Sequence, residues 1–288
     1  MFKNLSAGAI GIRGATLAET ISLAERSGFN GVDFSIREVA ALSDGYGMDY
    51  VRGMFEDGGV RPGQWGLPVA WRDDVQYQQD LASLPRLAEV AAELGCLRTA
   101  TWCPPASDDR PFDENFEWHA NRFRPIAAVL KEHGCRLGIE FIGPQTLRAG
   151  RKYEFIHTLG GMMALAEAIG TGNVGLLLDA WHLYTSGGQV QDLDQITAED
   201  IVTVHVNDAP AGVPLEEQVD NVRRLPMATG VIDLPAFMRK LDELGYDGPV
   251  TPEPFSESLN ELAARDPLAA AERAAAHMDR MWAAAFGD

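Results

Sequence analysis

Short apolar runs of five to nine residues, each followed by turn-forming residues, recur eight times along the chain. Between them lie segments with helical periodicity, and several of these end in glycine, the residue that a helix C-terminus prefers. A strand followed by a helix, repeated eight times, predicts an α/β fold, a (β/α)8 TIM barrel with a C-terminal helical extension. The expected strands are 6–12, 31–35, 62–69, 97–105, 136–144, 174–182, 201–209 and 249–255, and the expected helices include 16–28, 79–95, 121–134, 154–170, 234–245 and the tail 266–285.

An open, doubly wound sheet would show a similar spacing of strands and helices. That fold carries a phosphate-binding glycine loop after its first strand, and no such loop follows the first apolar run here. The chain also lacks a Pro/Ser-rich linker or a change in composition that would divide it. Residues 1–288 are therefore predicted to form one barrel domain.

The balance of charge excludes several classes of partner. The chain has 24 basic and 42 acidic residues, a formal net charge of −18, which repels phosphodiester backbones and anionic lipids. No stretch of about 18 apolar residues predicts a membrane span, and the N-terminal segment does not resemble a secretion signal. Three cysteines without CxxC spacing give little support to disulfides or a cysteine zinc site. We expect a cytoplasmic protein with neither nucleic acid nor membrane as partner.

Polar residues interrupt the last four strands near their C-terminal ends. Side chains in a barrel strand alternate between the surrounding helices and the barrel axis. In the strand at 201–209, Val202, Val204 and Val206 form the helix-facing set, which leaves His205 facing inward. The same alternation turns one acid inward on each of the other three strands: Glu140, Asp179 and Glu253. These four side chains should converge at the end of the barrel where active sites of this fold lie.

Three carboxylates this close together need a counter-charge. Neighbouring strands are about 4.8 Å apart, and two carboxylates at about 4 Å repel by roughly 4 kcal/mol at an effective dielectric constant of about 20. Either some acids are protonated or a divalent cation neutralises them, and the imidazole of His205 favours the cation. Oxygen-rich ligation with one nitrogen suits Mn²⁺ best, with Mg²⁺, Co²⁺ and Zn²⁺ as alternatives.

With these residues in place, the sequence resembles the xylose-isomerase-like TIM-barrel superfamily of sugar phosphate isomerases and epimerases over nearly its whole length. The most specific motifs are "GIEF", "LLLDAWH", "VHVND", "RRLPMATGVID" and "PVTPEPF". The resemblance implies a divalent metal site formed by Glu140, Asp179, His205 and Glu253. It also implies that Glu140 and Glu253 exchange the proton of the substrate carbon from opposite sides.

The resemblance extends to residues that bind the substrate. It implies that His182 hydrogen-bonds a substrate oxygen and that Arg223, with Arg224 as the alternative, reaches the enediolate. The "LPMATG" segment after these arginines is one residue longer than the LPGxG of many relatives. Many relatives are dimers or tetramers, so a homo-oligomer is expected by analogy.

Aromatic side chains are expected at the mouth of the predicted barrel. Trp65, Trp102, Trp181 and Phe255 lie at or beyond strand ends, where they either wall a substrate pocket or pack as ordinary core residues; Trp102 is selected as a substrate contact. The long loop 143–161 is a candidate lid or phosphate contact, although its Arg148 is expected to be a solvated charge.

The sequence thus predicts a metal-dependent isomerase or epimerase acting on a small ketose or keto-sugar through an enediolate. The metal polarises the carbonyl and a carboxylate moves the proton. A lyase or dehydratase acting on an inosose or a 3-keto-glycoside begins with the same enediolate and stays open as the alternative. An apurinic-endonuclease-type nuclease would need more histidine ligands and a basic groove, and a non-catalytic binding subunit would show a broken ligand set.

Overall fold

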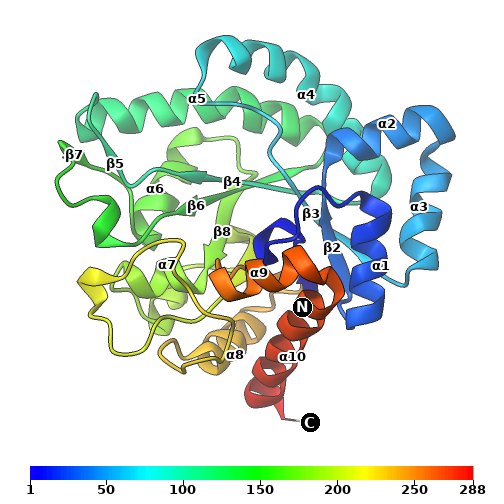
Figure 1. Ribbon diagram of the computed structural model, residues 1–288. Coiled ribbons are helices and arrows are strands. Elements are labelled where there is room, and N and C mark those ends of the chain that lie inside the picture. The colour runs from blue at the N-terminus through cyan, green and yellow to red at the C-terminus, as the bar shows by residue number, and fades with distance from the viewer. Residues whose placement is uncertain (288) are drawn as a thin grey trace.

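Eight parallel strands close into a barrel in the computed structural model, which describes residues 1–287 (Figure 1). The strands pair in the order β1-β10-β9-β8-β6-β4-β3-β2. This confirms the predicted TIM-barrel fold. The barrel strands are β1 (Phe2–Leu5), β2 (Gly31–Phe34), β3 (Arg61–Gly66), β4 (Arg98–Cys103), β6 (Arg136–Phe141), β8 (Val174–Asp179), β9 (Ile201–Val206) and β10 (Pro249–Pro252).

The predicted position of the first strand is wrong. The expected run 6–12 forms a loop with a single 3₁₀ turn at Gly8–Ile10, and β1 precedes it. Gly11, at φ +89°, turns the chain in a way that few other residues tolerate. Only Phe2 and Leu5 of the four residues of β1 are apolar, but the strand closes the barrel by pairing with both β10 and β2, a constraint that local apolarity does not reveal.

The helices surround the barrel, and the C-terminal helix α10 lies beside the N-terminus (Figure 1). Glycine in the left-handed conformation caps α1, α4, α6 and α8 at their C-termini, as expected. Helix α6 begins five residues later than predicted, after the N-cap Thr158. The helices are α1 (Leu17–Ser27), α2 (Ile36–Tyr46), α3 (Met48–Asp57), α4 (Asp74–Leu94), α5 (Phe112–Glu132), α6 (Leu159–Ile169), α7 (Ala180–Thr185), α8 (Leu234–Leu244), α9 (Glu257–Arg265) and α10 (Pro267–Phe286).

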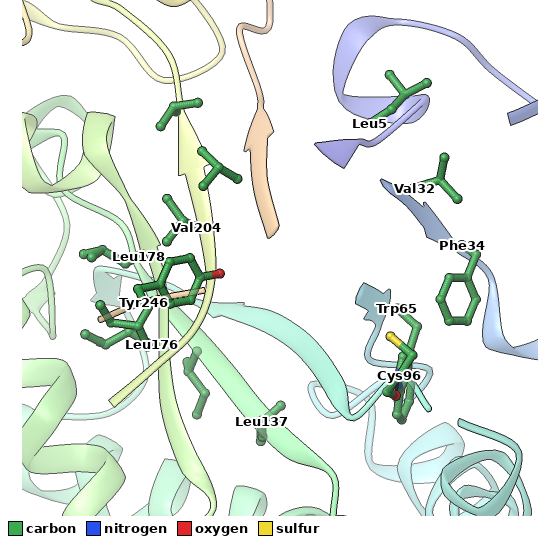
Figure 2. Close-up of a cluster of buried hydrophobic side chains, with 14 of the residues drawn as sticks. Leu5, Val32, Phe34, Trp65, Cys96, Leu137, Leu176, Leu178, Val204 and Tyr246 are labelled. Carbon is green, nitrogen blue, oxygen red and sulfur yellow. Dashed lines mark hydrogen bonds between the residues drawn. The ribbon is translucent and has the colours of Figure 1, made fainter. Parts of the chain in front are cut away.

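The main hydrophobic core fills the space between the barrel and these helices. Leu137, Leu176, Leu178 and Val204 belong to one cluster of buried side chains (Figure 2), and all four are on the faces that the sequence alternation assigned to the helices. Their intervening neighbours therefore face the barrel axis, which is how the polar residues near the strand ends reach a common centre.

Two short strands outside the barrel connect the loops after β4 and β6. Strand β5 (Ala106–Ser107) pairs antiparallel with β7 (Tyr153–Glu154). This pairing ties loop 143–161 to one side of the barrel mouth. Within residues 1–287 no helix has the length and apolar character needed to cross a membrane.

Candidate active site

The four residues predicted to hold a metal lie together at the carboxyl end of the barrel. Glu140 is on β6, Asp179 ends β8, His205 is on β9, and Glu253 follows β10 directly. Parallel pairing aligns Asp179 with His205 across β8 and β9. One ligand atom from each of the four side chains lies within 4.8 Å of all the others.

The donor set of this cluster fits a divalent cation. His205 Nδ1 lies 3.4 Å from Glu253 Oε2 and 3.8 Å from Glu140 Oε1. His205 Nδ1 and Glu140 Oε1 are both buried, and neither has a hydrogen-bond partner within residues 1–287. A buried polar atom without a partner is costly, and one cation between these atoms would satisfy both. Three oxygen ligands and one nitrogen suit Mn²⁺, Mg²⁺, Co²⁺ or Zn²⁺.

Charge is distributed unevenly over the cluster. Burial, with the neighbouring Glu253 and Asp179, raises the pKa of Glu140 well above its usual value. Burial acts in the same direction on Glu253, but the charges of His205 and Arg223 outweigh it and lower the pKa of Glu253. The pKa of His205 rises to about 10 because the surrounding carboxylates overcome the opposing effect of burial. Without a metal, protons and an arginine must therefore balance the acids.

Arg223 supplies a fixed positive charge inside the cluster. Its Nη1 donates to Asp179 Oδ2 at 2.8 Å and to Glu253 Oε2 at 2.9 Å, and its Nη2 donates to Asp220 Oδ1 at 2.8 Å. The side chain is only 2% exposed. Its neighbour Arg224 instead pairs through its backbone with Asp208, so only Arg223 reaches the cluster.

The loop that carries Arg223 is held in place by Asp208. This buried carboxylate accepts backbone N–H bonds from Thr229, Gly230 and Ile232 at 2.7–3.1 Å. These bonds tie residues 208–232 to the end of β9 despite the longer "LPMATG" segment. The loop therefore presents its arginine to the site from a fixed base.

His182 lies in the first turn of α7, beside Arg223 and Glu140. The backbone N–H of Gly143 donates to His182 Nδ1 at 3.1 Å, so the neutral ring carries its proton on Nε2. Burial and the charge of Arg223 lower the pKa of His182 well below its usual value and keep the ring neutral. His182 Nε2 lies 3.0 Å from Arg223 Nη2. Two N–H donors therefore stand side by side, suited to one substrate oxygen.

Two residues behind His205, Gln64 and Asp33, were not predicted as site residues. Gln64 Nε2 lies 3.5 Å from His205 Nε2 and donates to Asp33 Oδ2 at 3.2 Å. Burial raises the pKa of Asp33 to about 6. Applying the strand alternation to β3 would have found Gln64, which faces the axis because its neighbour Trp65 faces the helices.

A pocket of about 510 Å³ opens above the cluster. Trp102 and Phe255 line it, together with Glu140, Glu253 and His182. Trp102 is 43% exposed, so its side chain is open to a ligand in this pocket.

Trp65 and Trp181 do not line this pocket; of the two alternatives that the sequence left open for them, the structure shows ordinary core packing. Trp65 is fully buried beside Cys96, whose carbonyl oxygen accepts from its Nε1 at 3.1 Å (Figure 2). Trp181 is also fully buried, and the Arg223 guanidinium lies over its ring, 5.5 Å from the ring centroid.

Loop 143–161 contributes two residues, Leu147 and Arg151, to the wall of the pocket. Arg148 in this loop is not a solvated charge: its side chain is 10% exposed and donates to the carbonyl oxygen of Gly143 at 2.5 Å. Thr146 donates to the carbonyl oxygen of Gln218 at 2.8 Å. The loop is thus fastened at both residues beside the site.

A pocket that encloses two reachable carboxylates at the carboxyl end of a parallel barrel defines an enzyme of the TIM-barrel class. Within that class the chain belongs to the xylose isomerase-like TIM barrel family, whose model matches residues 21–281. The predicted membership is confirmed.

Individual relatives agree with this assignment. The chain is 23% identical over 271 residues to an inosose isomerase of Halalkalibacterium halodurans, which covers 91% of this chain and 90% of the relative. The structure of a xylose isomerase domain protein from Alicyclobacillus acidocaldarius matches 99% of both chains with a TM-score of 0.84 and 30% identity. The IOLI protein with a bound zinc atom has the same fold over 100% of both chains, with a TM-score of 0.78 and 18% identity. Fold, pocket and relatives identify an enzyme of the isomerase and epimerase type.

Proposed function

We propose that the protein is a divalent-metal-dependent isomerase or epimerase that moves a proton beside the carbonyl of a small ketose or keto-sugar. One observation carries this proposal. Glu140 and Glu253 both line the pocket, with side chains 10% and 17% exposed, whereas the side chain of Asp179 is fully buried. The two glutamates can therefore contact a substrate as well as bind a metal, whereas Asp179 can bind the metal but cannot contact the substrate.

The cofactor follows from the donor set. Glu140, Asp179, His205 and Glu253 would hold the ion, and Mn²⁺ is the ion we expect. When bound, it supplies Lewis-acid polarisation of the substrate carbonyl and favours the enediolate.

The remaining chemistry belongs to side chains of this chain. Glu253, kept ionised by His205 and Arg223, is placed to take the proton from the substrate carbon. Glu140, on the other side of His205, is placed to return a proton. His182 Nε2–H and the Arg223 guanidinium donate to a substrate oxygen, and Trp102 and Phe255 limit the access of water. General acid–base catalysis of this kind contributes about 10² to 10⁴-fold to the rate.

The proposal is tested by incubating Mn²⁺-loaded protein in D₂O with a panel of ketoses, inososes and keto-glycosides and following the products by NMR. We expect carbon-bound deuterium in an isomer of otherwise unchanged composition. Glu253→Gln should abolish this exchange with the fold intact, whereas the exposed Glu257→Gln on α9 should leave it unchanged. If the substrate loses water or an aglycone and no isomer forms, the reaction is an elimination and not an isomerisation. Near-normal deuterium exchange by the Glu253→Gln variant would refute the role of Glu253 in proton transfer.

A further inference from the structure

A second pocket, of about 420 Å³, adjoins the candidate active site. The two pockets share four wall residues: Arg72, Pro104, Ala106 and Arg151. The second pocket extends from this shared wall to the start of α5. A ligand bound at the carboxylate cluster could therefore extend one substituent into it.

Buried polar groups of the second pocket lack partners. Asn115 and His119, which are 3% and 2% exposed, both line it. His119 Nδ1 lies 2.8 Å from the carbonyl oxygen of Asn115, so Nδ1 carries the ring proton and Nε2 is an acceptor. Within residues 1–287 neither His119 Nε2 nor the Asn115 amide nitrogen has a hydrogen-bond partner.

Two arginines at this pocket have aromatic contacts but no acceptor. The Arg72 guanidinium lies 5.4 Å from the ring centroid of Trp102, and that of Arg110 lies 4.5 Å from Trp118. Over the described part of the chain, neither side chain makes an ion pair or donates a hydrogen bond. Stacking leaves the edges of both guanidinium planes free, and those edges match a carboxylate or phosphate in geometry.

The acids around this pocket are largely neutralised. Asp74 pairs with Arg122, and Asp108 binds Arg151 through both oxygens at 2.9–3.0 Å. Asp109 is the remaining acid; its side chain is exposed, so solvent and salt screen its charge.

We propose that the second pocket binds an anionic group, a carboxylate or a phosphate, carried by the substrate away from its reacting carbon. Arg72, Arg110 and the Asn115 amide donate to this anion, and His119 Nε2 accepts from a neighbouring hydroxyl. A neutral sugar ring fits less well because guanidinium groups already lie over the indole rings that it would stack on. This inference rests on the proposed function, since it names the substrate class of the same site.

The test measures binding to the Mn²⁺-loaded full chain by isothermal titration calorimetry. D-glucuronate and myo-inositol 1-phosphate represent the two anions, and D-glucose and myo-inositol are their neutral counterparts. At least one anion should bind about tenfold or more tightly than its counterpart, as expected for charge-assisted hydrogen bonds. The anion that does so distinguishes a sugar acid from a sugar phosphate.

Variants separate a specific subsite from general charge. Arg110→Gln should weaken binding of the anion about tenfold and leave the neutral sugar unchanged. Arg72→Gln should weaken binding of the anion to a similar extent. Arg61→Gln is the matched control, because Arg61 also lies over an aromatic ring, that of Phe2 at 5.3 Å, but begins β3 at the opposite end of the barrel. It should leave binding of the anion unchanged.

The outcomes distinguish this inference from the proposed function. Equal affinity for charged and neutral probes, no binding of either anion at millimolar concentration, or equal losses in all three variants would overturn the subsite. Selective binding of an anion without deuterium exchange in any sugar would support the subsite and reject the isomerase proposal.

Discussion

The guanidinium of Arg223 donates to the buried carboxylate of Asp179 across 2.8 Å, in the centre of the residues proposed to hold a metal. Both side chains are almost completely shielded from solvent. An ion pair in such a place costs desolvation free energy, which only mutual attraction and further hydrogen bonds can offset. The arginine therefore balances part of the acidic charge of the cluster in the metal-free protein.

Replacing Arg223 should destabilise the metal-free protein strongly. Arg223→Gln leaves Asp179 and Glu253 without their charged donor, and we expect a loss of about 3–5 kcal/mol in the free energy of unfolding. Urea denaturation in the presence of a chelator measures it. Arg86→Gln is the control, because Arg86 makes exposed ion pairs with Asp44 and Glu89 that contribute at most about 1 kcal/mol. Equal losses in the two variants would contradict the internal role of Arg223.

Metal content should depend on Asp179, although this residue does not line the pocket. Replacing hydrogen-bond partners of metal ligands already costs about 10–100-fold in affinity, so Asp179→Asn should cost more. Elemental analysis of dialysed protein should find one divalent ion per wild-type chain and almost none in the variant. A chelator should lower the melting temperature of the wild type only. Asp57→Asn, at the exposed end of α3, should keep its metal; if Asp179→Asn also keeps it, the assignment of the four ligands fails.

The barrel and its four convergent polar residues were predictable because both depend on local patterns. Alternation along β9 places His205 on the axis whatever its neighbours are, and the end of a strand fixes the height of a side chain in the barrel. Strand β1 was not predictable in this way. Its residues, with the buried Asn4 bonded to Asp33 and Thr251, become a strand only through pairing with β10, from the other end of the chain.

The walls of the pocket were the harder part. Nearness to a strand end does not decide whether a side chain faces the helices or the mouth, so Trp65 and Trp102 looked equivalent in the sequence. The contacts of Arg223 with Asp179 and of Arg72 with Trp102 depend on how loops fold over the barrel. Those contacts join segments far apart in sequence, and no periodicity marks them.

Adding one methyl group at Gly143 should disturb His182. A Cβ atom there would lie 2.5 Å from Thr185 Oγ1 and still closer to the carbonyl oxygen of His182. Helix α7 must therefore move, and we expect Gly143→Ala to cost about 1–3 kcal/mol in stability and to raise KM for the substrate. Thermal denaturation and steady-state kinetics measure the two effects. Gly160→Ala, with open space around its added Cβ, should show neither.

The free energy of unfolding should decrease at acidic pH because of His119. Burial lowers its pKa to about 4, while the unfolded chain has the ordinary value of about 6.5. The unfolded state therefore binds a proton first, and stability decreases as the pH falls from about 6.5 towards 4. A difference of about 2.5 pKa units corresponds to about 3 kcal/mol. Urea denaturation at a series of pH values measures this slope.

His119→Phe isolates this contribution, because phenylalanine keeps the aromatic contact with Phe155, whose ring centroid lies 4.8 Å away, but cannot titrate. The variant loses the hydrogen bond to the carbonyl oxygen of Asn115. The difference in the free energy of unfolding between variant and wild type at neutral pH measures the cost of that loss and of any change in packing, apart from the effect of protonation. Below pH 6.5 the free energy of unfolding should decrease less steeply in the variant than in the wild type. At pH 4 the loss in the variant should be smaller by about 3 kcal/mol. Parallel pH profiles of the two proteins would show that His119 binds its proton equally well in the folded and unfolded states.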